Sequence, residues 1–160
     1  MIVVADSGST KTDWTVVSEN GDVVEKIKTI GFNPYFQTSD YIYSVVKEAF
    51  SKISSVNNEI EEVFFYGAGC SSDDKKQIVH YALSKIFVNA EIEVDHDMVA
   101  ASRATLQSSP GIACIIGTGA NSCVWDGNSI IDNIPSHGYI FGDEGSGSYL
   151  GIELLKLYLN

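Results

Sequence analysis

Side chains suited to phosphate chemistry gather near the N-terminus, where residues 6–12 read DSGSTKT. An apolar run over residues 2–5 ends at Asp6, and a second β-rich run covers residues 14–17. Two strands joined by a small, hydroxyl-rich turn form a hairpin whose tip can present backbone N–H groups to an anion. A carboxylate at the end of the first strand is placed to hold a hydrated Mg²⁺ beside a phosphate. The pattern therefore indicates a site for nucleotide phosphates.

The candidate phosphate contacts are the residues of this turn. They are Ser7, Gly8, Ser9, Thr10, Lys11 and Thr12. The segment is not a Walker loop, because the spacing G-x-x-x-x-G-K-[ST] is absent and a strand is expected next. A lone lysine at a polar turn is commonly solvated, so the backbone is expected to matter more than Lys11. An ordinary hairpin with a polar tip is the alternative reading of the same residues.

Asp97 is the candidate general base. It lies between a strand expected over residues 92–94 and a helix expected over residues 98–106. Transfer of a phosphoryl group to a hydroxyl needs a carboxylate within hydrogen-bond reach of that hydroxyl. An aspartate directly before a helix is also a common N-cap, worth about 1 kcal/mol, and spacing alone favours the cap. Asp95 is the competing base, and His96 is expected to be a partly exposed loop residue.

Composition limits the classes of partner. The 160 residues carry a formal charge of −11, which argues against nucleic acid, because phosphates would be repelled at most approaches. No apolar run approaches the length of a membrane span, and the N-terminus lacks the basic and apolar regions of a signal peptide. The three cysteines have no metal-site spacing and indicate free thiols in a reducing cytoplasm. A cytoplasmic domain without nucleic-acid or membrane partners is expected.

The elements that must position these residues follow a β-β-β-α-β-α-β-α order. Further strands are expected over residues 23–30 and 62–66, with helices over residues 40–53, capped by Ser39, and 73–87. An antiparallel start followed by β-α units predicts a mixed sheet with helices on its faces.

The opening pattern then repeats after a break at residues 108–110. An apolar strand over residues 112–116 leads to a glycine-rich tip, GTGANS, and strands over residues 123–126 and 129–134 follow. Two such hairpins would place two phosphate-binding tips across one cleft. The repeat therefore favours a phosphate site at the first hairpin over an ordinary hairpin with a polar tip. The predicted organisation is a first lobe over residues 1–108 and the beginning of a second over residues 109–160.

Three motifs carry a resemblance over essentially the whole chain: DSGSTKTDW, IIGTGANS and GDEGSGSYLG. In this order they resemble the sugar kinase/hsp70/actin superfamily, with its ribonuclease H-like, actin/hexokinase-type α/β fold. Within it, the chain looks like the group of N-acetylglucosamine kinases and BadF-type ATPases. Members of that group are longer, and their adenosine-binding segment lies beyond residue 160. The resemblance implies ATP and Mg²⁺ as cofactors, with the metal bound through water at Asp6.

The resemblance also implies roles for individual residues. The kinases carry their catalytic aspartate just before the matching helix. This favours Asp97 as the general base over Asp97 as an N-cap alone, and it implies that Asp97 also contacts the sugar. Gly117, Thr118 and Gly119 would contact nucleotide phosphate. The positions implied to contact the sugar are Asn33, Thr118, Gly119, Asn121, Tyr139 and Asp143. Asn33 before a proline is also a common turn residue, Asp143 could complement a helix dipole, and Tyr139 could be a core residue.

Three functions remain open on the sequence. The preferred one is an ATP-dependent kinase for an N-acetylated amino sugar. The second is a BadF-type activator ATPase with an iron–sulfur cluster held across a dimer, although Cys114 and Cys123 look like buried strand residues. The third is a non-catalytic sugar-binding fragment. A helix expected over residues 145–159 is apolar nearly all round and should be buried in a full second lobe. Without the remainder of that lobe, much of the helix is expected to be exposed or paired with another copy, so a homodimer is a further expectation.

Overall fold

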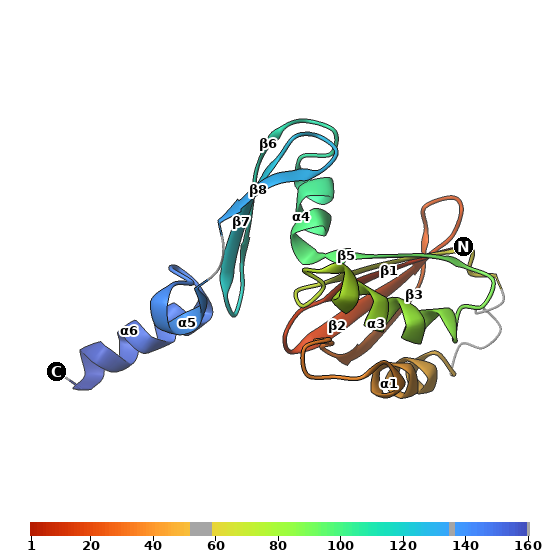
Figure 1. Cartoon of the computed structure of the whole chain (residues 1–160), viewed down its shortest axis with the longest axis horizontal. Helices are drawn as coiled ribbons and strands as arrows, with labels where there is room; N and C mark the ends of the chain where they lie inside the picture. Colours follow the sequence, from red (N-terminus) through yellow and green to blue (C-terminus); the bar gives the residue numbers. More distant parts are fainter. Residues whose placement is uncertain (52–58, 135–136, 160) are drawn as a thin grey trace. The chain divides into compact units, whose positions relative to one another are not determined.

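The computed structural model describes residues 1–51, 59–134 and 137–159. They form two compact units, Met1–Asp97 and Met98–Asn160, each with its own sheet (Figure 1). In the chain, the first unit ends at Asp97 and the second begins at Met98, and the division into lobes over residues 1–108 and 109–160 stays a prediction. Among the described residues, no helix has the length and apolar character that a membrane crossing requires.

The first unit is built on a five-stranded mixed sheet with the order β3-β2-β1-β4-β5. β1 (Ile2–Ser7), β2 (Lys11–Val17) and β3 (Val23–Ile30) are antiparallel, while β4 (Glu62–Gly67) and β5 (Glu91–His96) extend the sheet in parallel beside β1. The predicted strands are thus confirmed, most of them longer by one or two residues at their ends. The strand ends of β1, β4 and β5 come into register, because Asp6 pairs with Tyr66 and Tyr66 with Asp95.

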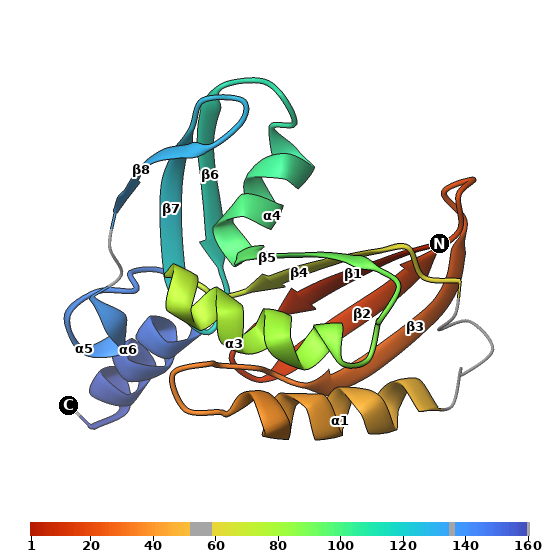
Figure 2. The same ribbon diagram turned by 45° about the vertical axis from the view of Figure 1, so that its right-hand side comes forward.

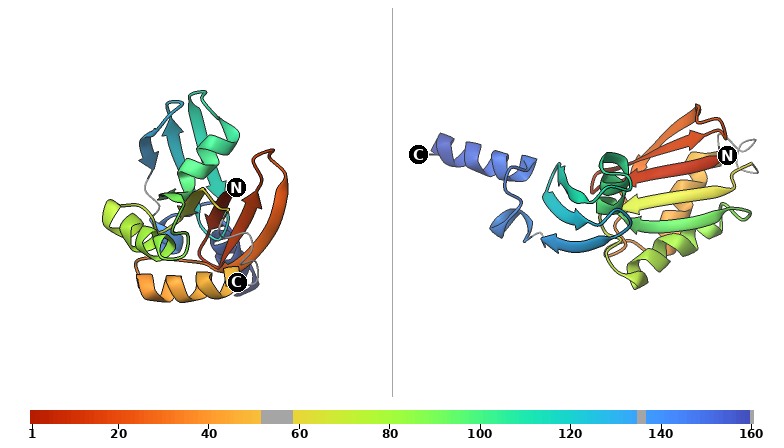
Figure 3. Two further views of the ribbon diagram at one scale, coloured as in Figure 1. Left: turned by 90° about the vertical axis from the view of Figure 1, so that its right-hand side faces the viewer. Right: turned by 90° about the horizontal axis from the view of Figure 1, so that it is seen from above.

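Two helices, α1 (Ser39–Ser51) and α3 (Asp73–Ser84), pack against each other on one face of this sheet (Figures 1 and 3). In α1, Ile42, Val46 and Phe50 recur at helical spacing and are buried. Among the described residues of this unit, α1 and α3 therefore share one face of the mixed sheet. Alternation along β1 buries Val3, Ala5 and Ser7 on the covered side and leaves Asp6 on the other.

Aromatic rings fill the core beneath the two helices. Trp14 meets Phe50 with ring centroids 5.4 Å apart, and Phe50 meets Phe87 at 5.0 Å, both edge to face. α1 is preceded by Thr38, whose hydroxyl accepts a hydrogen bond from the Tyr41 amide at 3.4 Å. Thr38 rather than Ser39 is therefore the capping residue. The predicted end of this helix, at residues 52–53, lies outside the described residues.

The second unit contains the predicted repeat. β6 (Gly111–Ile116), β7 (Ala120–Trp125) and β8 (Ile130–Ile134) form an antiparallel meander (Figure 2), as β1, β2 and β3 do. Both meanders carry a register shift near the far end of their middle strand, at Val16/Val17 and Val124/Trp125. The recurrence in hydrophobic pattern thus corresponds to a recurrence in strand pairing.

Helix α4 (Asp97–Thr105) packs against this second sheet, which explains where the units divide. Its buried residue Met98 contacts the cluster formed with Ala113 and Cys123, and the Ser102 hydroxyl lies 3.4 Å from the Cys123 sulfur. The boundary therefore precedes α4, because the helix contributes its buried side chains to the later sheet.

The chain ends in α5 (Gly138–Phe141), which the sequence did not predict, and α6 (Gly147–Leu159). No residue of α6 is buried. This agrees with the expectation that much of the helix is exposed without the remainder of the second lobe. Its exposed apolar side chains are Leu150, Leu154, Leu155, Leu157, Tyr158 and Leu159.

Candidate active site

The β1–β2 hairpin tip offers backbone donors. The Gly8 amide donates to the Lys11 carbonyl at 3.0 Å and closes the turn. The amides of Ser9 and Thr10 lie at the exposed tip and donate to no acceptor among the described residues. Successive free N–H groups at a tight turn form a site that favours an anion. The geometry suits the predicted phosphate contact through backbone rather than through side chains.

Ser7 and Thr12, which were predicted as phosphate contacts, are fully buried at the base of this tip. Thr12 Oγ1 donates to the Ile30 carbonyl at 3.0 Å and shares a 2.8 Å hydrogen bond with Ser7 Oγ, which accepts from the Phe32 amide at 3.1 Å. These hydroxyls are therefore occupied in tying the tip to the loop that begins at Gly31. A Cβ on Gly31 would lie 2.2 Å from the Gly8 carbonyl oxygen, so the two backbones approach as only glycine permits.

Lys11 is held by an ion pair with Asp13, which also lies 3.7 Å from Lys28. The pairing raises the pKa of Lys11 above its usual value and lowers that of Asp13. Lys11 is thus engaged with its own strand rather than simply solvated. Its ammonium still contributes positive charge beside the tip.

Asp6 lies at the end of β1, on the face opposite Ser7. Partial desolvation raises its pKa above the usual value, and repulsion from Asp97 and then Asp13 adds to the effect, while Lys11 opposes it. Solvent still reaches the side chain, so the desolvation is partial. Two carboxylates that repel each other at one end of a sheet would be relieved by a divalent cation.

The donor set fits a largely hydrated metal. Among the residues that the structure describes, no group of three or more histidine, cysteine, aspartate or glutamate side chains could enclose an ion. A Mg²⁺ ion at Asp6 would therefore take most of its ligands from water and phosphate, which is how this ion is commonly bound.

Asp95 and Asp97 have different surroundings. Asp95 Oδ1 forms an ion pair with Lys76 Nζ at 2.8 Å and accepts a hydrogen bond from the His96 amide, also at 2.8 Å. Asp97 Oδ1 is buried and accepts no hydrogen bond from any described residue. His96 Nδ1 lies 2.9 Å from this oxygen without the alignment of a hydrogen bond, and the two groups form an ion pair only when the imidazole is protonated. A buried polar oxygen without a donor is costly and suits a group that awaits a ligand.

Asn33 lies in the loop between β3 and α1. Its side-chain oxygen accepts from the Tyr35 amide at 3.0 Å, while its backbone amide donates to Gln37 Oε1 at 2.8 Å. A Cβ on Gly69 would lie 2.8 Å from that side-chain oxygen, so the loop packs closely against the turn after β4. The side-chain amide nitrogen of Asn33 makes no hydrogen bond with a described residue and remains available as a donor.

The second hairpin tip, between β6 and β7, is braced by the segment before α6. The Ala120 amide donates to Asp143 Oδ1 at 3.2 Å, and the Gly147 amide donates to the Gly117 carbonyl at 2.9 Å. Asp143 adopts a left-handed backbone conformation with φ 62°, which is strained for a residue other than glycine or asparagine. The amides of Thr118 and Gly119 donate to no described acceptor. This tip therefore presents free backbone donors, as the first does.

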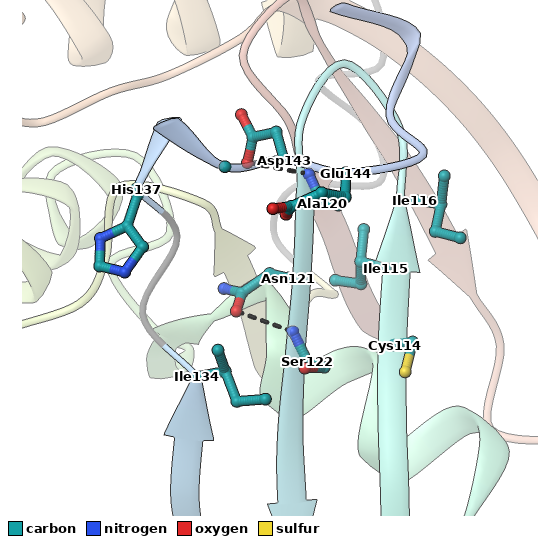
Figure 4. A pocket seen from close by; sticks show the side chains of 11 residues that line it. Cys114, Ile115, Ile116, Ala120, Asn121, Ser122, Ile134, His137, Asp143 and Glu144 are labelled. Carbon is teal, nitrogen blue, oxygen red and sulfur yellow. Dashed lines mark hydrogen bonds between the residues drawn. The ribbon is translucent and has the colours of Figure 1, made fainter. Parts of the chain in front are cut away.

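A pocket of about 410 Å³ lies beside this tip (Figure 4). Asn121, Asp143, Glu144 and His137 line its polar side, and Ile115 and Ile134 contribute apolar surface. Asn121 Oδ1 accepts from the Ser122 amide at 2.8 Å. A partly apolar pocket of this size with a few convergent polar groups is typical of small-molecule sites.

The structure thus brings Asn121 and Asp143 together but leaves Tyr139 elsewhere. Tyr139 is 61% exposed and lines a different hollow, together with residues of α6. His137 and Glu144 line the Asn121 pocket, although neither is among the predicted binding residues. Their nearness to Asp143 in the chain was the available signal. Of the predicted residues, Asp6, the first tip, Asn33 and Asp97 belong to the first unit, and the remainder to the second.

Comparison with known proteins connects these features to a family. The profile of the BadF/BadG/BcrA/BcrD ATPase family matches residues 5–160. A solved structure of a proposed N-acetylglucosamine kinase from Porphyromonas gingivalis is 41% identical, with a TM-score of 0.93 over 99% of this chain and 56% of that one. This chain therefore spans little more than half the length of that protein. No curated protein matches the chain.

More distant structures share the fold. A proposed N-acetylglucosamine kinase from Chromobacterium violaceum has a TM-score of 0.70 at 18% identity, over 98% of this chain and 55% of that one. A ROK family glucokinase from Streptomyces griseus, in complex with glucose and AMPPNP, has a TM-score of 0.57 at 19% identity, over 81% of this chain and 45% of that one. The α/β fold predicted from the motifs, that of the actin and hexokinase type, is confirmed.

Proposed function

This chain belongs to the BadF/BadG/BcrA/BcrD ATPase family, and from that premise we propose that it is part of an ATP-dependent kinase for an N-acetylated amino sugar. The proposed acceptor follows the 41% identical relative, which is described as a proposed N-acetylglucosamine kinase. ATP use follows the family. The sugar and the reacting residues are inferences from the site.

The observation that carries the proposal is the contrast between two neighbouring carboxylates. Asp95 is neutralised by Lys76, whereas Asp97 keeps a buried oxygen that no described donor satisfies. A general base needs a lone pair that is free to accept a proton from its substrate. Asp97 meets this requirement better than Asp95, and the hydroxyl of a bound sugar would supply the missing donor.

The proposed reaction transfers the γ-phosphoryl group of ATP to a sugar hydroxyl. Asp97 accepts the hydroxyl proton, the sugar oxygen forms a bond to the γ-phosphorus, and the bond to the bridging oxygen of ADP breaks. The products are ADP and a sugar phosphate. Mg²⁺ held through water at Asp6 would neutralise negative charge on the phosphates.

Binding roles follow from the free donors. The amides of Ser9 and Thr10 at one tip, and of Thr118 and Gly119 at the other, would hold phosphate oxygens. Asn121 and Asp143 would contact the sugar in the pocket that they line within the second unit. A carboxylate and an amide suit the hydroxyl and N-acetyl groups of such a sugar.

An ADP-release assay tests the proposal. The longest natural form of the protein is incubated with ATP and, separately, glucose, glucosamine, N-acetylglucosamine or N-acetylmannosamine. ADP release should require an N-acetylated sugar and fall by about 10² or more in Asp97→Asn. The control is Asp22→Asn, an exposed carboxylate whose removal should leave the rate unchanged.

An activator ATPase is the second candidate, supported by the family description. It predicts sugar-independent ADP release that survives Asp97→Asn. The cysteines considered for its cluster lie on opposite faces of the second sheet. Cys114 pairs with Ser122, the neighbour of Cys123, and side chains alternate along a strand, so Cys114 is exposed and Cys123 is buried. These two thiols therefore cannot ligate one cluster together.

A further inference from the structure

An ion pair anchors the strand end that precedes Asp97. Lys76 Nζ lies 2.8 Å from Asp95 Oδ1, and the two side chains are only 30% and 25% exposed. The same oxygen accepts the His96 amide at 2.8 Å. One carboxylate oxygen therefore joins a side chain of α3 to the backbone that leads into α4.

The partners come from elements that are fixed independently. Lys76 lies in the first turn of α3, where its amide donates to the Ser72 carbonyl at 2.9 Å, and α3 packs against β5. Asp95 is held in the sheet by its register with Tyr66 of β4. Beyond it, only His96 separates the ion pair from Asp97, whose buried oxygen faces His96 Nδ1 at 2.9 Å.

We propose that Lys76 is a positioning residue, which holds Asp95 and so fixes the β5–α4 turn in the conformation that presents Asp97 to the acceptor hydroxyl. The assignment rests on the proposed function of Asp97 as base. Asp95, the alternative candidate for the general base, is then a residue that orients the turn. Lys76 itself touches neither sugar nor phosphate in this account.

A merely structural ion pair would behave differently. Partly exposed pairs contribute about 0–1 kcal/mol to stability, so removing this one should change unfolding little. Misplacement of a catalytic group by about 1 Å can cost about 10²-fold in rate. The proposal therefore predicts a loss in kcat that is out of proportion to any loss in stability.

Four variants of the longest natural form separate the roles. Lys76→Met should lower kcat by about 10–10²-fold, with the KM for ATP and the unfolding temperature near those of the parent. Lys76→Arg keeps a charged donor and should retain most of the activity. Asp95→Asn keeps an acceptor for both donors and should also remain active. Lys85→Met, which removes an exposed pair with Asp40 at the residue that caps the C-terminal end of α3, is the control.

Amide hydrogen exchange gives a readout that does not depend on activity. The His96 amide should exchange faster in Lys76→Met than in the parent, and unchanged exchange would overturn the proposal. Loss of activity in Asp95→Asn as deep as in Asp97→Asn would overturn it too, because Asp95 would then be the base. Absence of sugar-dependent ADP release in the parent would reject the proposed function, while exchange still decides the positioning of the turn.

Discussion

Three aspartates with the same chemistry differ because of their neighbours. Asp6 is crowded by other carboxylates, Asp95 is paired with Lys76, and Asp97 keeps an oxygen without a donor. Sequence position could predict that Asp6 and Asp97 lie at strand ends. It could not predict the partner of Asp95, because Lys76 comes from a separate helix and the contact depends on how α3 packs against β5.

Removal of the Asp6 charge should raise stability and lower the rate of catalysis. The pKa of Asp6 is raised in the folded protein, so its contribution to stability is greatest below its usual value, near pH 3.8, and is lost as pH rises through the folded pKa. Asp6→Asn should therefore unfold at a higher temperature than the parent at pH 7.5, with a smaller difference near pH 4. Catalysis should fall by about 10²-fold.

Thermal unfolding at the two pH values measures this effect. Asp22→Asn, which removes an exposed charge, is the control. The electrostatic account would be contradicted if the unfolding temperature of Asp6→Asn, measured against the parent, rose less at pH 7.5 than at pH 4.

The cysteines should differ in reactivity. Burial raises the pKa of Cys70 to about 12, and Cys123 is also buried, whereas Cys114 is exposed and lines the pocket with Asn121 and Asp143. Alkylation of the native protein should therefore modify Cys114 first. N-acetylglucosamine at saturating concentration should slow that modification, if the pocket takes the sugar.

Mass spectrometry of digested protein identifies the modified thiol, and Cys114→Ser is the matched control. Equal modification with and without the sugar would separate the pocket from sugar binding.

At the scale of elements, the first hairpin and the following loop act as one hydrogen-bonded piece. Ser7 links Thr12 with the Phe32 amide, and Gly31 lies against Gly8. The hairpin itself was predictable, because two β-rich runs flank a small polar turn. The inward role of Ser7 and Thr12 was not, because strand alternation assigns them to the covered face only once the sheet is known.

Ser7→Ala should destabilise the protein. The substitution leaves the buried Phe32 amide without its acceptor and removes one of the two hydrogen bonds of the Thr12 hydroxyl, at a cost of about 1–3 kcal/mol. Ser9→Ala at the exposed tip is the matched control and should change the free energy of unfolding little. Denaturant unfolding measures both, and equal stability of the two variants would show that the buried network contributes nothing.

In the second unit, the hydrophobic pattern predicts the strands but not the irregular segment that follows them. Strands β6, β7 and β8 were predictable because apolar runs alternate with glycine-rich turns as they do near the N-terminus. The short helix α5 was missed because four residues carry too little periodicity, and it begins at Gly138 with φ 71°. The pocket that uses Glu144 and His137 depends on this irregular segment.

At the scale of the whole molecule, the two units divide the proposed machinery between them. Asp6, Asn33 and Asp97 belong to one unit, and Asn121 and Asp143 to the other. The apolar character of α6 was predictable from its sequence. Its exposure was predictable too, because a helix that is apolar all round needs a partner surface, and the described residues do not supply one.

The 160-residue chain by itself should therefore self-associate. Exposed leucines along α6 form apolar surface of the kind that drives association. Sedimentation velocity should show concentration-dependent dimers or larger species, and Leu154→Glu with Leu157→Glu should reduce them. A chain that remains monomeric at all concentrations would contradict this expectation.

The most direct test of the account is transfer of the γ-phosphoryl group itself. In a single turnover with γ-labelled ATP and N-acetylglucosamine, the longest natural form should place the label in sugar phosphate. Asp97→Asn should slow that step by about 10²-fold or more, while Asp95→Asn stays near the parent. Label that appears only as free phosphate, at a rate independent of sugar and of Asp97, would contradict the kinase assignment and its base.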